Sequence, residues 1–247
     1  TGVVTTMTGE VWLVRGLAGD LADLRWKRFA TGLHQPLGVK VVADRIHVIC
    51  RDQVTRLDDL NGDDEADFYA CVSQSLFASP GGHDFVIGLE TDDQGRFLTA
   101  SGSQGLIRLD KSGGCTVLAT GLRNPNGIGL SVDGRFLTSS LQEGNWTPAS
   151  AIVQVDLASL SRPHFGEGGP GRNGISPPLL YLPRGEDNSS AGQVHLGTGR
   201  WPSLAGEGNL VHLSFGSGTA WMVTRQQVGG IWQGAAQRLT GSMQSGV

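Results

Sequence analysis

One short stretch gathers more potential metal ligands than any other part of the sequence. Within residues 59–67, side-chain oxygens stand at relative positions 1, 3, 5 and 9, on Asp59, Asn61, Asp63 and Asp67. A hard cation such as Ca²⁺ prefers oxygen ligands, and this spacing lets a loop wrap around one ion, with a backbone carbonyl near position 7. The stretch therefore predicts a structural calcium site.

Two features of the same stretch leave a simpler interpretation open. Asp64 stands where a glycine usually follows the third ligand, and Ala70 occupies the twelfth position, where an EF-hand has a glutamate. The stretch is therefore not an EF-hand. A solvated polar loop without a cation remains the alternative.

A second group of residues could move or stabilise charge. Residues 79–82 (Ser-Pro-Gly-Gly) are turn formers that deliver His83 to the start of a strand. Imidazole can accept a proton at neutral pH, because its ordinary pKa is about 6.5. Arg123 and Asn124 lie in another turn, residues 119–127. Each of these side chains also has a structural interpretation: His83 could cap its strand, and Arg123 and Asn124 could brace their turn.

The elements that position these residues are marked by internal repeats. Residues 30–38 (Ala-Thr-Gly-Leu-His-Gln-Pro-Leu-Gly) and 119–127 (Ala-Thr-Gly-Leu-Arg-Asn-Pro-Asn-Gly) agree at six of nine positions. Residues 95–99 and 134–138 are both Gly-Arg-Phe-Leu-Thr. Spacings of about 40 residues, and of about twice 45, are typical of the four-stranded blades of a β-propeller. In the first repeat the scaffold residues recur while His34-Gln35 changes to Arg123-Asn124, which favours a chemical role for the second pair.

Strand signals support this fold class. Short apolar or alternating runs, separated by turn residues, predict strands at residues 11–15, 24–29, 39–42, 45–50, 54–57, 85–89, 96–99, 106–109, 116–119, 126–130, 135–138, 151–155, 193–196, 210–213 and 219–223. We expect an all-β fold: a propeller of four-stranded antiparallel blades, six-bladed in the full protein. The sequence holds about five blades and ends without a closing strand in residues 241–247, so we expect it to be an incomplete ring, a single domain over residues 1–247 that is a fragment of a longer chain.

Composition excludes several classes. A hydrophobic content of 38% and a charged content of 17% are values of a globular protein. The net charge of −4 gives no reason to expect nucleic-acid binding. No apolar run is long enough for a transmembrane helix. The cysteines, Cys50, Cys71 and Cys115, are three in number and form no Cys-x-x-Cys motif. One disulfide and three buried thiols both remain open, and three buried thiols are favoured.

Residues 161–188 break the blade pattern, because they are rich in glycine, proline and arginine and have little strand signal. A long irregular insertion in a compact domain is usually functional or covers a site. Trp146 and Trp201 could stack on sugar rings, although the six tryptophans of a propeller more often pack its blades. Ser189-Ser190 has no Gly-x-Ser-x-Gly frame and no suitable pair of acids appears, so a serine hydrolase or polysaccharide-cleaving enzyme is disfavoured.

Four motifs in order resemble a known family: residues 81–85, 121–127, 143–148 and 182–190. Together they resemble the soluble sugar dehydrogenases that use pyrroloquinoline quinone (PQQ). They are closest to the propellers described as membrane-bound dehydrogenases in Planctomycetes and Verrucomicrobia. The resemblance covers most of the chain and implies an oxidoreductase that transfers hydride from a sugar or polyol hydroxyl to a quinone cofactor.

The resemblance also implies roles for individual residues. His83 would be the base that removes the hydroxyl proton, and Arg123 and Asn124 would contact the quinone. The backbone of Gly144 and Asn145 would hold a cofactor Ca²⁺. Arg184 and Asp187 would line the rim of the same pocket.

The sequence departs from the family pattern at three places. Ser103 stands where the family has the acid that orients the histidine, and Asp84 is a candidate replacement. Gly216 or Ser217 stands where the family has a lysine for the cofactor. The late arginines of the family would align beyond Val247. These departures favour the alternative function, a non-catalytic propeller that binds carbohydrate or a partner protein.

The resemblance implies partners and a location as well. We expect a sugar or a small molecule derived from a polysaccharide as the ligand, and an electron-accepting cytochrome as the protein partner. The expected location is extracytoplasmic or periplasmic.

Overall fold

The computed structural model describes residues 1–81, 84–159, 161–197, 208–241 and 243. These residues form nineteen β-strands in five antiparallel sheets and a single 3₁₀ turn, η1 (Leu21–Asp23). In this described part, no helix is both long and apolar enough to span a bilayer. The all-β class predicted from the repeats is confirmed.

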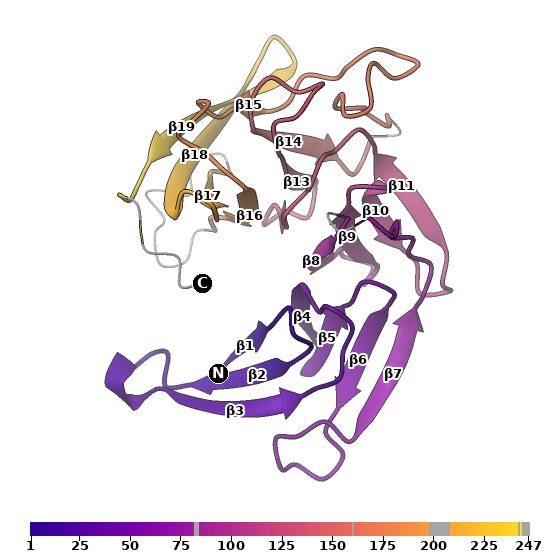
Figure 1. The fold of residues 1–247 in the computed structure, drawn as a ribbon, viewed down its shortest axis with the longest axis vertical. Helices are drawn as coiled ribbons and strands as arrows, with labels where there is room; N and C mark the ends of the chain where they lie inside the picture. Colours follow the sequence, from indigo (N-terminus) through magenta and orange to yellow (C-terminus); the bar gives the residue numbers. More distant parts are fainter. Residues whose placement is uncertain (82–83, 160, 198–207, 242, 244–247) are drawn as a thin grey trace.

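The five sheets stand side by side as the blades of a propeller (Figure 1). Blade 1 has three strands, β1 (Gly2–Thr5), β2 (Val11–Arg15) and β3 (Arg25–Ala30). Blade 2 consists of β4 (Gly38–Val42), β5 (Arg45–Ile49), β6 (Val54–Asp58) and β7 (Phe68–Ser73). Blade 3 consists of β8 (Val86–Thr91), β9 (Phe97–Ser101), β10 (Gly105–Leu109) and β11 (Cys115–Ala119).

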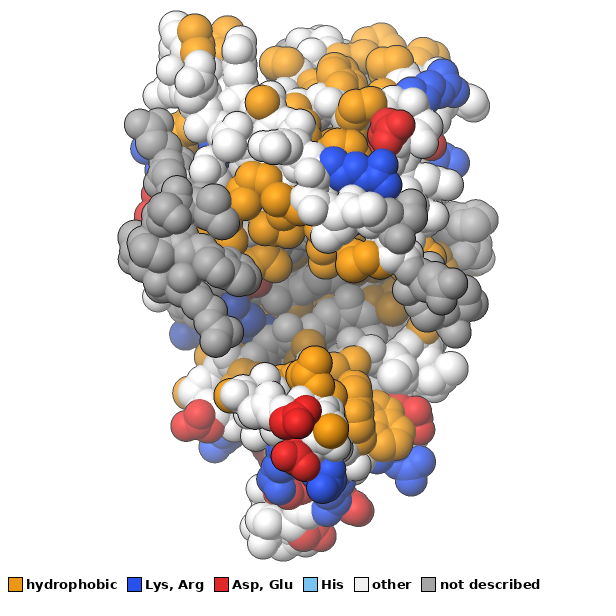
Figure 2. Space-filling model, turned by 90° about the vertical axis from the view of Figure 1, so that its left-hand side faces the viewer, with side chains coloured by type: hydrophobic (Ala, Val, Ile, Leu, Met, Phe, Trp, Pro, Cys, Tyr) orange, Lys and Arg blue, Asp and Glu red, His pale blue; other side chains and the backbone are white. Residues whose placement is uncertain are grey.

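The two remaining blades complete the arc. Blade 4 consists of β12 (Ile128–Leu130), β13 (Phe136–Leu141), β14 (Ala151–Asp156) and β15 (Leu180–Tyr181). Blade 5 consists of β16 (Ser190–His195), β17 (Leu210–Ser214), β18 (Thr219–Val228) and β19 (Ile231–Arg238). Blades 1 and 5 do not meet through their described residues, and the face between them is hollowed, with hydrophobic side chains on both sides (Figure 2). Acidic and basic side chains lie together at the lower end of that view. The six-bladed full ring remains a prediction.

Strand order divides the connections between two ends of the ring. In each four-stranded blade the chain runs from the innermost strand to the outermost one, each antiparallel to the last. The connections between blades, and those between the second and third strands, therefore lie at the same end, here called end A. The remaining connections lie at the opposite end, here called end B. In blade 1, Gly9 O in the β1–β2 turn accepts a hydrogen bond from Leu33 N, which lies in the connection to blade 2. The β1–β2 turn therefore lies at end A as well.

Neighbouring inner strands approach each other at glycines. A β-carbon on Gly38 would lie 2.7 Å from the carbonyl carbon of Gly88, and one on Gly127 would lie 2.6 Å from the Cα of Gly192. No real side chain tolerates such distances to a backbone. The last residue of the repeated turn is therefore a glycine because it begins the contact between one inner strand and the next.

The repeated nine-residue turn has the same backbone conformation in both of its copies. Gly32 and Gly121 have φ of 78° and 74°, and Gln35 and Asn124 have φ of 50° and 42°. The left-handed region is unfavourable for most L residues, and asparagine tolerates it better than most of them. The two nine-residue stretches are thus one turn used twice, each leading into an inner strand.

The second repeat supplies a hydrophobic residue and a hydrogen bond to its blade. Leu98 and Leu137 are fully buried in the cluster between blades 3 and 4. Thr99 Oγ1 donates to Gly88 O at 2.7 Å, and Thr138 Oγ1 donates to Gly129 O at 3.1 Å. In both blades the threonine satisfies a carbonyl of the inner strand, which is the reason that the residue recurs.

The strands predicted from sequence are present, with small shifts in their ends, but four strands were not predicted: β1, β7, β15 and β19. The last blade has the expected four strands, because β19 completes it beyond a turn at Gly229-Gly230. The three cysteines are free thiols. Cys50 is buried as predicted, whereas Cys71 and Cys115 are exposed.

We expect Gly127→Ala to destabilise the protein much more than Gly134→Ala. Both glycines have positive φ, 136° and 71°, so each alanine carries a backbone cost of roughly 1–2 kcal/mol. Only at Gly127 does the new methyl meet backbone atoms, which adds roughly 1–3 kcal/mol of overpacking; nothing lies within 4 Å of the position at Gly134. Urea unfolding of the two variants measures the difference. Equal losses would show that the blades can separate at no cost.

We also expect His195 to make stability depend on pH. His195 is buried between blades 4 and 5, with Nε2 3.1 Å from Thr138 Oγ1. Burial, with the nearby Arg225 cation, lowers the pKa of His195 to about 4. In the unfolded chain its pKa is about 6.5, so the unfolded state takes up the proton first as pH falls. His195 therefore makes its full contribution to the free energy of unfolding above a pH of about 6.5. This contribution, roughly 3 kcal/mol, is lost as the pH falls toward 4.

The free energy of unfolding, measured in urea from pH 7 to pH 4, should therefore fall less steeply in His195→Gln than in the wild type. His34→Gln, which alters an exposed histidine, is the control and should keep the wild-type slope. An unchanged slope in His195→Gln would contradict the assignment.

Candidate functional site

Topology brings the residues predicted for cofactor and substrate to one end of the ring. They lie on connections between blades or between second and third strands, so they belong to end A: Arg123, Asn124, Gly144, Asn145, Arg184 and Asp187. His83 precedes β8 in a connection of the same kind but lies outside the described residues. The loop 59–67 joins β6 to β7 and lies at end B, apart from the others.

Arg123 and Asn124 connect two loops of blade 4. The Arg123 guanidinium donates to Glu143 O, and Asn124 Nδ2 donates to Gln142 Oε1 at 2.7 Å. Gln142 N returns a hydrogen bond to Arg123 O at 3.0 Å. Only one of the N–H groups of this guanidinium is used in these contacts. The other N–H groups bond to none of the described residues, which leaves them available to a ligand.

Gly144 lies directly beneath the Arg123 side chain. A β-carbon at Gly144 would lie 2.7 Å from Arg123 Cδ and 3.2 Å from Glu167 Oε2. That carboxylate oxygen is buried and has no hydrogen-bond partner among the described residues. A buried carboxylate oxygen without a partner is costly unless a donor or a cation meets it. The Gly144 turn is thus flanked by a guanidinium and by an unsatisfied carboxylate oxygen.

Glu167 reaches this position because the insertion after β14 returns to end A. His164 pairs with Thr120 in an isolated bridge, and Phe165 N donates to Thr120 O at 2.9 Å. Glu167 N donates to Gly121 O at 3.0 Å. Phe165 is buried in the cluster between blades 3 and 4. The insertion therefore builds part of end A, and nothing in the sequence singled out Glu167.

Asp84 organises the loop that carries His83. Its carboxylate is buried and accepts hydrogen bonds from Ser79 N at 2.6 Å and Ser103 N at 3.1 Å. Burial alone would raise the pKa of Asp84, but the donors of Ser103 and Ser79 outweigh it and hold the pKa below its ordinary value. A carboxylate therefore lies against Ser103, the position at which the family resemblance expects an acid.

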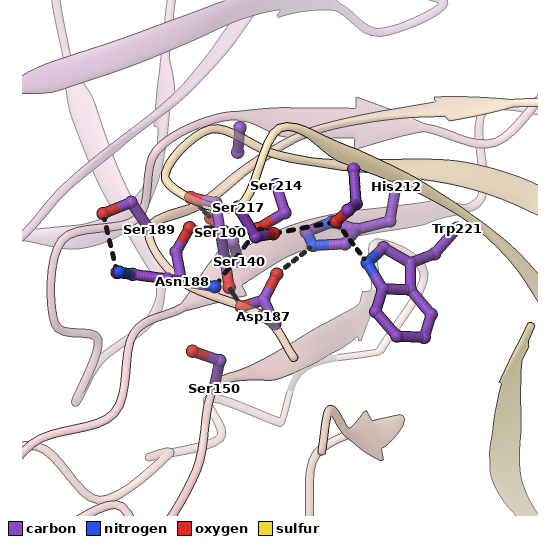
Figure 3. Close-up of polar contacts among 12 residues, drawn as sticks. Ser140, Ser150, Asp187, Asn188, Ser189, Ser190, His212, Ser214, Ser217 and Trp221 are labelled. Carbon is purple, nitrogen blue, oxygen red and sulfur yellow. Dashed lines mark hydrogen bonds and ion pairs between the residues drawn. The ribbon is translucent and has the colours of Figure 1, made fainter. Parts of the chain in front are cut away.

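The two residues predicted for the rim of the pocket have different environments. Arg184 is exposed, whereas Asp187 is buried. Asp187 Oδ2 accepts from Ser190 Oγ at 2.5 Å, and Oδ1 lies 3.4 Å from Nε2 of the fully buried His212 (Figure 3). Direct contact between Asp187 and a cofactor is a prediction that this geometry does not support, since both of its oxygens are engaged inside blade 5.

The network around Asp187 is structural. Burial acts to raise the pKa of Asp187, but hydrogen bonds from His212, Ser190 and Ser214 outweigh it and leave the pKa lowered. Gln193 Nε2 lies 3.3 Å from His212 Nδ1, so the imidazole is held from both sides. In a nucleophilic triad the histidine lies between serine and acid. Here the carboxylate lies between Ser190 and His212 (Figure 3), so the serine is not activated.

The loop 59–67 turns its carboxylates toward its own backbone. Asp59 accepts from Gly62 N and Asp64 N, and Asp67 accepts from Leu60 N. Desolvation would raise the pKa of Asp59, but these backbone donors hold it below its ordinary value. In the described part of the chain, no three His, Cys, Asp or Glu side chains are grouped as metal ligands. The calcium prediction for this loop therefore remains a prediction.

A cleft of about 610 Å³ lies beside this loop, between blades 1 and 2, and Asp44, Arg56, Asp58 and Asp59 are among its lining residues. It contains none of the residues predicted for the quinone or the sugar. The cofactor prediction therefore depends on the loops of end A and not on this cleft.

Comparisons with known proteins agree with the fold. No model of a protein family matches the sequence, and no curated protein does. A solved glucose dehydrogenase superposes with a TM-score of 0.72 at 16% identity, covering 97% of this chain and 83% of its own. The soluble aldose sugar dehydrogenase of Escherichia coli gives 0.68 at 14%, covering 96% and 82%. The PQQ domain of pyranose dehydrogenase from Coprinopsis cinerea gives 0.62 at 14%, covering 99% and 79%.

At such low identities these likenesses establish the fold alone: the chain has the β-propeller architecture of these sugar dehydrogenases. They do not distinguish the Planctomycetes and Verrucomicrobia group. That narrower resemblance, like the roles of the individual residues, stays a prediction.

We expect Asp187→Ala to destabilise blade 5 by roughly 2–4 kcal/mol, because it leaves buried His212 and Ser190 without their acceptor. Glu186→Ala is the matched control. Glu186 is the adjacent acid, and it forms an exposed ion pair of 3.1 Å with Arg238, so its loss should cost less than about 1 kcal/mol. Thermal unfolding compares the two variants. Full stability of Asp187→Ala together with weaker cofactor binding would restore the rim assignment.

Proposed function

We propose that this protein is an oxidoreductase of the sugar dehydrogenase type, which oxidises a sugar or polyol hydroxyl with PQQ as the hydride acceptor. The propeller architecture shared with solved sugar dehydrogenases supports the proposal. The observation that carries it is the arrangement at Gly144. There a guanidinium, the Glu143 carbonyl that it binds and a buried carboxylate oxygen without a described partner lie together at end A.

The residues of this arrangement fit the implied groups. Glu167 Oε2 and the backbone carbonyls of Gly144 and Asn145 have the oxygen chemistry that Ca²⁺ prefers. Arg123 and Asn124 would hold the quinone, and a fixed guanidinium stabilises negative charge on a neighbouring oxygen. Bound PQQ would supply the two-electron acceptor.

The chain itself would supply the proton chemistry. His83 is the proposed base, and it follows directly from the turn that Asp84 fixes through Ser79. Asp84 also reaches Ser103, so its carboxylate can take the place of the acid that the family has there. A nearby carboxylate favours the protonated imidazole. Proton removal by His83 would thereby be supported without an acid at position 103.

A specific observation favours the second candidate, a non-catalytic propeller that binds carbohydrate or a partner protein. Arg123 and Asn124 both donate to a neighbouring loop of their own blade, which is what residues that only brace a turn would do. Gly216 and Ser217 also leave the loop between β17 and β18 without the lysine of the family. Binding of PQQ decides between the candidates.

Location and partners follow from the first candidate. We propose an extracytoplasmic or periplasmic protein that passes its electrons to a cytochrome. A sugar or a polysaccharide-derived small molecule would be the electron donor.

Calorimetric titration of the protein with PQQ, with and without Ca²⁺, tests the proposal. We expect binding that depends on calcium. Arg123→Ala should weaken it by at least about tenfold, the usual effect of losing a charge-assisted hydrogen bond. Glu167→Gln should reduce the calcium dependence, because it removes the negative charge that faces Gly144.

Two controls make this titration decisive. Arg25→Ala, at an exposed arginine on β3, should bind as the wild type does. His83→Ala should keep binding but lose turnover of glucose with an artificial electron acceptor. Absence of both binding heat and a thermal shift in the wild type would reject the quinone, and the non-catalytic propeller would stand.

A further inference from the structure

Trp146 is an exposed aromatic side chain beside the candidate site. Trp146 lies in the β13–β14 loop, two residues after Gly144, and 52% of its surface is exposed. Large aromatic side chains normally bury most of their surface in a propeller, as Trp221 does at 5% exposure. An indole left open next to a predicted binding loop requires an explanation.

The indole lies beside a glycine of the insertion. A β-carbon at Gly169 would be 3.4–3.6 Å from the Cη2, Cζ3 and Cζ2 atoms of Trp146, which is van der Waals contact. The φ of Gly169 is 101°, a conformation that L side chains rarely adopt. The six-membered ring of Trp146 therefore lies beside Gly169, with room for a methyl group between the two.

Gly169 is itself fixed by hydrogen bonds within the insertion. Gly169 O lies 2.8 Å from His164 Nε2, and Gly169 N donates to Gly166 O at 3.0 Å. His164 Nδ1 lies 3.0 Å from Thr120 Oγ1, at the end of β11. Through His164, the insertion thus connects Gly169, beside Trp146, to blade 3.

The loop that carries Trp146 is held as well. Gly144 N donates to Thr147 O at 3.1 Å, and Thr147 Oγ1, on a buried residue, donates to Gln142 O at 3.1 Å. Both hydrogen bonds close the loop around Trp146. The backbone on both sides of Trp146 is therefore fixed before any ligand arrives, which lowers the entropic cost of binding.

We propose that Trp146 is a stacking platform for a sugar ring and determines the substrate class of the site, an inference that rests on the proposed function. The face of an aromatic ring is electron-rich and attracts the partially positive C–H groups of an apolar surface. A pyranose presents such C–H groups together on one face of a rigid ring. An open-chain polyol does not, so the platform selects cyclic sugars over acyclic polyols.

Fluorine NMR of protein labelled with 5-fluorotryptophan tests the proposal without a cofactor. The probes are D-glucose and D-sorbitol, which have similar hydroxyl groups with and without a ring. The Trp146→Phe variant assigns the Trp146 resonance, and Trp26→Phe assigns that of Trp26. Trp26 is the matched control, because it is 55% exposed but lies on β3, the outer strand of blade 1.

We expect glucose to shift the Trp146 resonance in a saturable way, sorbitol to shift it much less, and neither to move Trp26. In turnover assays Trp146→Ala should raise KM for glucose about tenfold with little change in kcat, since stacking contributes to ground-state and transition-state binding alike. Trp146→Phe should lie between this variant and the wild type, and Trp26→Ala should match the wild type.

The outcomes separate the inference from the proposed function. A saturable shift of Trp146 in a protein that binds no PQQ would keep the platform and reject the dehydrogenase. Turnover of glucose with no shift at Trp146 and an unchanged KM in Trp146→Ala would reject the platform and keep the dehydrogenase. Equal shifts at Trp146 and Trp26, or equal shifts with glucose and sorbitol, would also overturn the inference.

Discussion

The close approach of neighbouring inner strands is the constraint on which the rest of the structure depends. Gly38 meets Gly88, and Gly127 meets Gly192, at distances that leave no room for a β-carbon. Each of these contacts sets where one blade begins relative to the last. The interblade turns at end A can repeat with nearly the same dihedral angles because they end at these contacts. A binding site assembled from several blades requires such fixed relative positions.

End A uses one device in several forms. In blades 2 to 5 a residue of the incoming connection is hydrogen-bonded to the loop between the second and third strands. Gln35 accepts from Arg51 in blade 2, Asp84 accepts from Ser103 N in blade 3, and Asn188 O accepts from Gly216 N in blade 5. Arg123 belongs to the same series in blade 4, but its guanidinium also covers Gly144 beside an unpaired carboxylate oxygen. What sets blade 4 apart is this unsatisfied oxygen, and not the presence of a polar turn residue.

Much of the scaffold could be predicted from sequence, because it depends on local signals. The repeated turns, the Gly-Arg-Phe-Leu-Thr strands and the Ala43-Asp44 hairpin, with φ of 48° and 60°, are all set by residues near one another in the chain. β19 was missed although Gly229-Gly230 is a hairpin signal, and β15 has only two residues. Glu167 and the burial of Asp187 could not be predicted. Each depends on segments far apart in sequence, Gly121 and Gly144 for one and His212 for the other.

The insertion has a structural cost that the last blade offsets. Because the chain crosses back from end B, where β14 ends, to end A, the outer strand of blade 4 is reduced to Leu180–Tyr181, and part of the blade would lie uncovered. The hairpin of β18 and β19 extends beyond β17 and covers this flank. Trp232 packs against Phe136 at 5.1 Å between ring centroids, and Gly234 N donates to Leu179 O at 2.9 Å. Blade 5 thus covers the flank of blade 4 that the short β15 leaves open. The insertion between β14 and β15 brings Glu167 and Gly169 to the candidate site.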